Sequence, residues 1–439
     1  QIDIPDWARP GGTNPAGNLE MNIIQNSQNG VIKWDSFDIG GSATVNFRGP
    51  QDFNTLNYVN SGAASQIYGT INANNNGNIF IVNPAGVQIG NSAQINVGSL
   101  YVSNKYLNES ELGNFAGTIT PEMINATKTA DAALMSLGNI NAATNVTFDG
   151  DRIVLDTERV IFENTNPNIK PTLNIKTTNA DSVVLGYDAY DEDTKYNHTV
   201  NNEKTFNITK VNINNNGHGN IIVNEKDATV KGYMWVEDVN QLQAIDTNLD
   251  GNYALRNSID ATATSSWNNN EGFKQIGTET NNAFTGKFDG LDYNIFGLTI
   301  NRSNEEDVGL FGVVNGATIN NVTLVGGSIT GNYRVGGIVG NAIGENTVIS
   351  NATNSASVTG NSQVGGIVGI ITGNSDNKSK VNNVINTGTI NGNAGNDVGG
   401  LIGSLNNSQL TGNSYNLGAV TSSGHDVGGL VGSASNSTI

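Results

Sequence analysis

Residues 78–98 read NIFIVNPAGVQIGNSAQINVG, and this stretch decides the fold. It holds three short apolar runs, 79–82, 87–89 and 94–97, separated by the turns Asn-Pro-Ala-Gly and Gly-Asn-Ser-Ala. In the second run apolar and polar residues alternate, with Val87 and Ile89 on one side and Gln88 on the other. Strands this short do not close a sandwich with loops of ordinary length. They predict a coil in which each turn of chain adds one strand to each of two or three parallel sheets, which is a parallel β-helix.

The composition favours one long solenoid over several globular domains. The chain has 439 residues with 54 Gly but only 8 Pro, and Asn forms roughly a sixth of it. Gly and Asn tolerate positive φ in tight turns, so a fold with many turns per strand uses them heavily. Disordered chains can also be rich in Gly and Asn, but here 36% of the residues are apolar and recur as short β-branched runs. The expected fold class is therefore all-β.

Charge and cysteine content exclude several kinds of partner. The net charge is −18, so neither nucleic acid nor anionic lipid is an expected partner. No apolar run reaches the length of about 18 residues that a membrane-spanning helix needs, so no transmembrane segment is expected. Cysteine is absent, which suits a chain that crosses a membrane unfolded, because no disulfide can form before export.

The clearest internal repeats lie near the end of the chain. A box of the type Val-Gly-Gly-Ile/Leu-Val/Ile-Gly begins at residues 335, 364, 398 and 427, and a period near 30 is typical of a solenoid. Its apolar residues supply a strand that stacks on the next rung, and its glycines remove side chains where the backbone bends or approaches another strand. Recurring Asn residues predict amide hydrogen bonds from rung to rung. A phosphate-binding loop is the alternative, but neither Lys-Ser/Thr nor a helix follows the box.

The pattern changes between the first strands and the repeats. Val239, Leu242 and Ile245 are at helical spacing, which predicts one short helix near 237–249. The polar segment 187–210 predicts a loop or hairpin that projects from the coil. We therefore expect a β-helix module at 1–232, a transition segment at 233–304 and Gly-rich β-helix repeats at 305–439. The last rung stops where another repeat half would begin, so a longer parent protein, truncated here at its C-terminus, is expected.

Two motifs in the first module resemble the N-terminal secretion domain of two-partner-secretion exoproteins, the haemagglutinin-type adhesins and their relatives. One is Trp-x-Ser-Phe-Asp-Ile-Gly at Trp34–Gly40, and the other is Asn-Pro-x-Gly-Val at Asn83–Val87. The family usually has Asn at the position of Ala85, and its further Asn-Pro-Asn-Leu motif is not found here. Residues 305–439 resemble the Gly-Leu-rich (GLUG-type) repeat of bacterial surface proteins.

The resemblance implies a right-handed parallel β-helix that is secreted to the surface of a cell with a Gram-negative-type envelope. It implies export through an outer-membrane β-barrel transporter whose periplasmic domains bind the first module. A solenoid suits this route, because each rung needs only its predecessor in order to fold. By the same resemblance, the residues expected to carry transporter recognition are Trp34, Phe37, Asp38, Asn83, Pro84, Ala85, Gly86 and Val87.

Groups for catalysis or metal binding are sparse. His occurs only at positions 198, 218 and 425 and Cys is absent, so a nucleophilic triad has few bases to use. Residues 246–251 (DTNLDG) are similar to the start of a calcium loop, but the twelfth position is Asn257 where that loop needs Glu. We interpret them as an Asx-rich turn without metal. A β-helix polysaccharide lyase or hydrolase would need several carboxylates on one face, and residues 149–152 and 188–193 come nearest.

The sequence thus predicts the N-terminal part of a secreted surface adhesin and not an enzyme. Its first module is expected to be the export signal, and the remainder a β-helical display scaffold for a ligand on a host or neighbouring cell. We expect a monomer without a cofactor. Two alternatives stay open, the export and stalk region of a secreted toxin or protease and, ranked below it, a β-helix polysaccharide-degrading enzyme.

Overall fold

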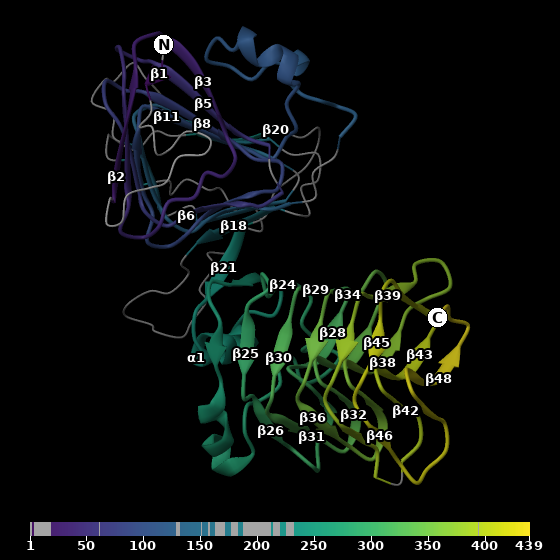
Figure 1. Ribbon diagram of the computed structural model, residues 1–439. Helices are drawn as coiled ribbons and strands as arrows, with labels where there is room; N and C mark the ends of the chain where they lie inside the picture. The colour runs from purple at the N-terminus through teal and green to yellow at the C-terminus, as the bar shows by residue number, and fades with distance from the viewer. Residues whose placement is uncertain are drawn as a thin grey trace. The chain divides into compact units, whose positions relative to one another are not determined.

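The computed structural model of the chain consists mainly of short parallel strands stacked into sheets (Figure 1). It describes residues 2–3, 19–60, 62–128, 132–150, 152–156, 159–162, 172–176, 183–187, 212–213, 220–224, 232–393 and 395–439. These residues form two compact units that divide at residues 232 and 233. Both units are parallel β-helices, which confirms the expected fold class. Residues 188–210 of the predicted loop, with His198, and also His218 lie outside the described part.

The first unit winds through three parallel sheets, which we call A, B and C in the order in which each rung enters them. Sheet A contains β2 (Glu20–Gln25), β4 (Thr44–Arg48), β7 (Thr70–Ala73), β10 (Gln94–Val97), β13 (Asn139–Ala142), β16 (Val160–Phe162) and β19 (Asn212–Ile213). Sheet B contains β3 (Asn29–Trp34), β5 (Asn54–Val59), β8 (Asn78–Val82), β11 (Ser99–Ser103), β14 (Asn145–Asp149), β17 (Thr172–Lys176) and β20 (Asn220–Asn224). Sheet C contains β6 (Ser65–Ile67), β9 (Val87–Ile89), β12 (Leu134–Ser136), β15 (Ile153–Asp156) and β18 (Val183–Tyr187). The short strand β1 (Ile2–Asp3) pairs antiparallel with β2 and so protects the edge of sheet A.

The interior of the first unit is a stack of apolar side chains at matching positions. Ile71, Ile95 and Ile140 are register partners on successive strands of sheet A, and all three are fully buried. On the opposite, outer face of the same strands, five asparagines form a ladder in which each amide Nδ2 donates to the Oδ1 of the preceding rung over 2.7–3.3 Å. This ladder is formed by Asn22, Asn46, Asn72, Asn96 and Asn141. The amide hydrogen bonds predicted for the repeats are confirmed at their Gly-Asn turns, where Asn361 donates to Asn332 and Asn393 donates to Asn361.

The second unit has five parallel sheets per rung, which we call D to H. Sheet D contains β21 (Gly232–Val236), β22 (Asn252–Leu255), β24 (Lys287–Asp289), β29 (Thr318–Asn320), β34 (Val348–Ser350), β39 (Ser379–Asn382) and β44 (Ser408–Thr411). Sheet E contains β23 (Ile259–Asp260), β25 (Asn294–Phe296), β30 (Thr323–Val325), β35 (Thr353–Asn354), β40 (Ile385–Asn386) and β45 (Tyr415–Asn416). Sheet F contains β26 (Thr299–Asn301), β31 (Ser328–Thr330), β36 (Ser357–Thr359), β41 (Ile390–Asn391) and β46 (Val420–Thr421).

Sheets G and H complete each rung and meet at the repeated Val-Gly-Gly box. Sheet G contains β27 (Glu306–Val308), β32 (Tyr333–Gly336), β37 (Ser362–Gly365), β42 (Val398–Gly399) and β47 (Val427–Gly428). Sheet H contains β28 (Phe311–Asn315), β33 (Val339–Ile343), β38 (Val368–Thr372), β43 (Ile402–Asn406) and β48 (Val431–Ser435). A Cβ atom on Gly366, in the corner between these sheets, would lie 2.3 Å from the carbonyl oxygen of Gly400 in the next rung. The glycines therefore allow the close approach that the sequence predicted.

A cap closes the first edge of the second unit. The predicted short helix is present as α1 (Val239–Ala244), and the carboxylate of Asp238 caps it by accepting from the backbone N–H groups of Asn240 and Gln241. Downstream, Ile276 and Phe284 pair with β28, and Gly272 bridges to β26. Residues 237–285 thus cover strand edges that would otherwise leave their backbone groups unpaired.

Candidate recognition site

The two sequence motifs lie at the same corner of the first unit, where each rung passes from sheet B to sheet C. Strand β3 ends at Trp34, and Ile39 then pairs with Ile67 of sheet C. Two rungs later, β8 ends at Val82 and β9 begins at Val87. One rung separates the motifs, and its own corner follows β5, which ends at Val59, and precedes β6, which begins at Ser65. The structure therefore places all eight predicted residues at one corner, which we call the B–C corner.

Asn83 organises the turn of the second motif and binds the rung before it. Its Oδ1 accepts from the backbone N–H of Ala85 over 2.9 Å, and its carbonyl oxygen accepts from the N–H of Gly86 over 2.9 Å. Its Nδ2 donates to the carbonyl oxygen of Ala63 and to Oγ of Ser65. Gly86 has a φ of +104°, and a Cβ there would lie 2.8 Å from the carbonyl oxygen of Ala133. The turn therefore depends on Asn and Gly for physical reasons.

The first motif binds the same middle rung from the other side. The carboxylate of Asp38 accepts from the backbone N–H of Gln66 over 2.8 Å. The ring of Trp34 lies 5.4 Å from that of Phe37, and its Nε1 donates to Oδ1 of Asn57 in β5. The corner of the middle rung is thus held between two motifs that are far apart in the sequence.

Burial divides the eight residues into two groups. Phe37, Asn83, Pro84, Gly86 and Val87 are buried and shape the corner. Asp38 is exposed, and Trp34 and Ala85 are half-buried, so these three present side-chain atoms to a partner of the folded chain. A role in recognition remains a prediction for all eight.

The structure also brings a segment to this corner that the sequence reasoning missed. In the fourth rung the chain leaves the coil between β11 and β12, and we call residues 104–128 of this excursion the lid. The lid contains the 3-10 helices η2 (Glu109–Asn114) and η3 (Pro121–Met123) and lies against the outer face of sheet B. It buries an apolar cluster there, formed by Leu56, Tyr58, Phe80, Val82 and Tyr101 of the sheet with Leu107, Leu112, Phe115 and Met123 of the lid.

Polar contacts fasten the lid close to the two motifs. Glu109 forms an ion pair with Lys33, the neighbour of Trp34, at 2.8 Å and accepts from Nδ2 of Asn60 at 2.8 Å. The hydrogen bond and charge of Lys33, helped by Asn60, lower the pKa of the Glu109 carboxyl. Both partners of this ion pair are about half exposed, so water screens it. Apolar contact is therefore the main attachment of the lid.

The carboxylates proposed for a polysaccharide-degrading site have other roles where they are described. Asp149 accepts a hydrogen bond of 2.6 Å from the hydroxyl of Tyr101, and the backbone of Asp149 accepts from Ser103. Burial and the nearby Asp149 raise the pKa of Tyr101. Asp151 and residues 188–193 lie outside the described part of the chain.

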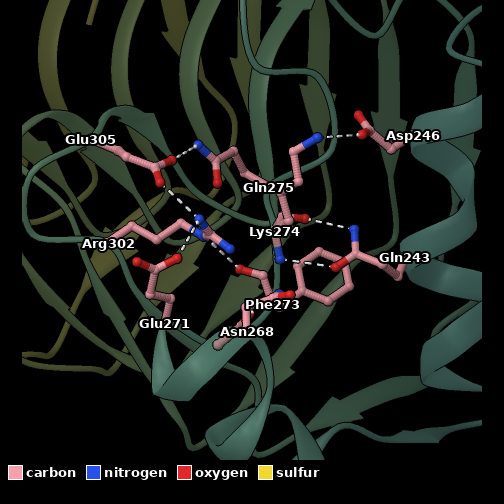
Figure 2. Close-up of polar contacts among 10 residues, drawn as sticks. Gln243, Asp246, Asn268, Glu271, Phe273, Lys274, Gln275, Arg302 and Glu305 are labelled. Atoms are coloured by element: carbon pink, nitrogen blue, oxygen red, sulfur yellow. Dashed lines mark hydrogen bonds and ion pairs between the residues drawn. The ribbon is translucent and has the colours of Figure 1, made fainter.

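The residues similar to a calcium loop belong to the cap of the second unit. Figure 2 shows the Lys274 side chain directed at Asp246, and the Nζ–Oδ2 distance is 3.0 Å. The other oxygen of Asp246 accepts from the backbone N–H of Gly277. Asp246 also borders an open hollow of about 420 Å³ lined mainly by Asp, Asn and Thr side chains. Both oxygens of this carboxylate are thus engaged, and the described residues include no group of three or more His, Asp or Glu arranged for a metal ion.

Arg302 joins the cap to the first complete rung. Its guanidinium donates to the carbonyl oxygen of Phe273 and to Glu305, and it lies 3.5 Å from Glu271 (Figure 2). Gln275 donates to the other oxygen of Glu305. This network holds loops together, and it presents no arrangement of acid and base for catalysis. None of the helices in the described ranges has the length and apolarity to cross a membrane.

Comparison with known proteins identifies relatives of the first half of the chain. The family model described as TPS secretion domain matches residues 8–251. Halomucin of Haloquadratum walsbyi is 37% identical over 188 residues, which are 41% of this chain and 2% of that protein. A heme/hemopexin-binding protein of Haemophilus influenzae is 33% identical over 169 residues, which are 38% of this chain and 18% of that protein. The matched parts are therefore small fractions of both relatives.

Among solved structures, the HMW1 secretion domain of Haemophilus influenzae aligns with 100% of this chain and 99% of its own at 14% identity. The TM-score is 0.25, too low to bear on the fold.

Proposed function

The chain belongs to the TPS secretion domain family, whose members are secreted through an outer-membrane transporter. We therefore propose that the B–C corner is the surface that this transporter recognises. In this proposal the periplasmic domains of the transporter bind the corner through Asp38, Trp34 and Ala85. The buried residues of the motifs, Asn83 above all, give the corner its shape. The family is one of secretion domains and not of enzymes, and we propose that these 439 residues carry no catalysis.

The observation that carries the proposal is the shared position of the two motifs. They are separated by more than forty residues, yet both bind the backbone of residues 63–66 from opposite sides. A partner that contacts this corner therefore meets both motifs at once. Packing of the coil alone does not require two different motifs at the B–C corner, since the other rungs pass from sheet B to sheet C without them.

The test is secretion with and without the co-expressed transporter. We expect extracellular yield to depend on the transporter and to fall several-fold for Ala85→Glu, which places a charge at the tip of the turn. The matched control is Asn91→Glu, because Asn91 is exposed in the same rung at the corner between sheets C and A. Equal yields for the two variants would refute recognition at the B–C corner.

A second measurement separates recognition from folding. Asn83→Ala removes three side-chain hydrogen bonds of a buried amide, so we expect a lower melting temperature, whereas Ala85→Glu should leave the melting temperature unchanged. If both variants melt early, the loss of secretion reports folding and not recognition.

We further propose that the second unit is the display scaffold of a surface adhesin, built from Gly-Leu-rich repeats at 305–439 behind a transition segment at 233–304. The regular repetition of its glycine corners and the polar residues on the outside of its strands support the proposal of a scaffold. Beads coated with the purified chain should bind host or neighbouring cells above the level of albumin-coated beads. Absence of binding would favour the alternative of an export and stalk region for a toxin or protease. The heme/hemopexin binding named for one relative belongs to that protein.

A further inference from the structure

We propose that the polar hollow in the cap of the second unit is a binding site for a short neutral saccharide. This inference rests on the proposed adhesin function, because it names the class of ligand that the second unit would bind on a cell surface. The hollow has a volume of about 420 Å³ and is lined by Asp246, Thr247, Asn248, Leu249, Asp250, Asn281, Asn282, Ala283 and Thr285. It lies outside both sequence motifs and outside the repeats.

Two loops of the cap form the walls of the hollow, and hydrogen bonds hold both loops in place. The carbonyl oxygen of Leu249 accepts from the backbone N–H groups of Thr285 and Gly286, which ties one wall to the other. The carbonyl oxygen of Asn248 accepts from the hydroxyl of Tyr253 over 2.7 Å. The hollow is therefore formed before a ligand arrives, so binding requires little ordering of the chain.

Several polar side chains of the hollow are available to a ligand. Four of them form no hydrogen bond or ion pair with any other described residue, those of Asn248, Asp250, Asn281 and Asn282. Asparagines inside the coil differ, since Asn354 spends its amide on Asn386 of the next rung. The amides and the carboxylate of the hollow thus offer donors and acceptors side by side.

The charges around the hollow exclude an anionic ligand. Neither Lys nor Arg is among the residues that line it, and the nearby Lys274 is paired with Asp246 (Figure 2). Asp250 has no cationic partner among the described residues. A phosphate, sulfate or carboxylate would therefore meet a negative charge and find no basic side chain to bind.

The lining also excludes an apolar ligand and a metal ion. Leu249 and Ala283 are the only apolar residues that line the hollow, so it could cover little apolar surface. Both oxygens of Asp246 are engaged, by Lys274 and by Gly277, and the described residues include no group of three His, Asp or Glu side chains for a cation. A neutral ligand that is polar over most of its surface fits these limits.

A saccharide has this chemistry. Its hydroxyl groups can donate to the carboxylate of Asp250 and can both donate to and accept from the amides of Asn281 and Asn282. The volume of the hollow lies near the lower end of the range for small-molecule sites, which favours a short saccharide. Because water competes for exposed groups, we expect a weak site that binds firmly only to many copies of the sugar.

The test uses the full chain and albumin that carries many copies of one sugar. The probes are albumins coupled to glucose, galactose, mannose, fucose or N-acetylglucosamine, and the controls are uncoupled albumin and albumin coupled to sialic acid. We expect saturable binding of at least one neutral probe, competition by the same sugar free in solution, and no binding of the controls. Equal binding of probes and controls, or binding of none of the neutral probes, would overturn the inference.

Variants of exposed residues locate the binding. Asn281→Trp fills the hollow and Asp250→Ala removes an acceptor, so we expect each to weaken binding about tenfold or more without lowering the melting temperature. The matched control is Asn304→Trp, because Asn304 is also exposed and has no side-chain partner among the described residues, but does not line the hollow. Unchanged binding in both variants, or an equal loss in the control, would refute binding in the hollow.

Cell binding separates this inference from the proposed function. Beads coated with the Asn281→Trp chain should bind fewer host or neighbouring cells than beads coated with the wild-type chain. Equal numbers would overturn the inference and leave the adhesin proposal standing. Wild-type beads that bind no cells, although the wild-type chain binds sugar-coupled albumin, would overturn the adhesin proposal alone.

Discussion

Both β-helical units stack parallel rungs around an apolar core, but the corners between their sheets differ. In the first unit, successive rungs between Asn22 and Asn141 are 24, 26, 24 and 45 residues apart, because their corners differ in length and one is long enough to form the lid. In the second unit, rungs 29 to 34 residues apart repeat one glycine corner almost unchanged. Outward positions of sheet F are small and polar, as in Thr299 and Asn301 or Ser328 and Thr330. Variable corners leave room for recognition, whereas uniform corners give a regular scaffold.

The largest effect that tests this contrast is expected at a glycine corner. Gly366→Ala would place a Cβ 2.3 Å from a backbone carbonyl oxygen that cannot move away, so we expect the second unit to lose about 3 kcal/mol or more of unfolding free energy. Gly429 is its equivalent in the last rung, and a Cβ added there would meet no other part of the chain within 4 Å, so Gly429→Ala should change stability by less than about 0.5 kcal/mol. Urea titration measures both, and similar losses would mean that the corners do not depend on close approach.

A buried amide of the second unit should give the next largest effect. Asn354 is fully buried, accepts from the backbone N–H of Ala356 and donates to Oδ1 of Asn386. Asn354→Ala leaves these groups without partners, and a loss of about 2 kcal/mol is expected in the same titration. A loss below half of that would show that water enters the corner and replaces the amide.

The outer ladder of the first unit should matter less. Asn72 donates to Asn46 and accepts from Asn96, but its side chain is only partly buried, and water can satisfy the neighbours. For Asn72→Ala we expect a loss of about 1 kcal/mol, measured by thermal unfolding of the first unit. A cost equal to that of Asn354→Ala would contradict the distinction between inner and outer amides.

The smallest expected effect is a dependence on pH in the second unit. Burial raises the pKa of Asp397, a hydrogen bond from Gln363 opposes this, and the charge of Asp426 in the next rung raises it further. The folded chain therefore keeps this proton to a higher pH than the unfolded chain does. The contribution of Asp397 to the free energy of unfolding is therefore fully present below its unfolded pKa, and it is lost as the pH rises through its folded pKa.

Asp426→Asn removes one source of that shift. The wild-type chain should lose free energy of unfolding as the pH rises from the unfolded pKa of Asp397 through its folded pKa. In the variant this loss should be smaller, by about 0.5 kcal/mol or less, because solvent screens both groups. Unfolding curves at a series of pH values measure it. A larger loss in the variant would reverse the assigned sign.

The sequence was sufficient for the coil but not for what covers it. Alternation in residues 87–97 and the Val-Gly-Gly boxes predicted the strands, because period and spacing are local properties of a chain. The lid was missed because β8 and β11 carry apolar residues on both faces, and a continuous apolar run does not show what covers its outer side. The runs themselves, such as Asn78–Val82, were the available signal.

The candidate site divides in the same way. The motif at Asn83–Val87 could be found by resemblance, and its turn by the residue types that turns require. The contact of Asn83 with Ala63 and Ser65 depends on the register between rungs, which the length of every corner in between decides. No local sequence pattern gives the combined length of these corners, so the sequence alone did not predict that the two motifs lie at one corner.

The glycine corners have a consequence for how such chains change length. Each corner of the second unit touches the equivalent corner of the next rung, as Gly337 does with Gly366 and Gly366 with Gly400. Deleting or duplicating one whole rung would therefore rebuild the same contacts at the junction, whereas removing a single residue would break them. Recombination between repeats can thus lengthen or shorten the scaffold in steps of about 4.8 Å, without selecting any new packing.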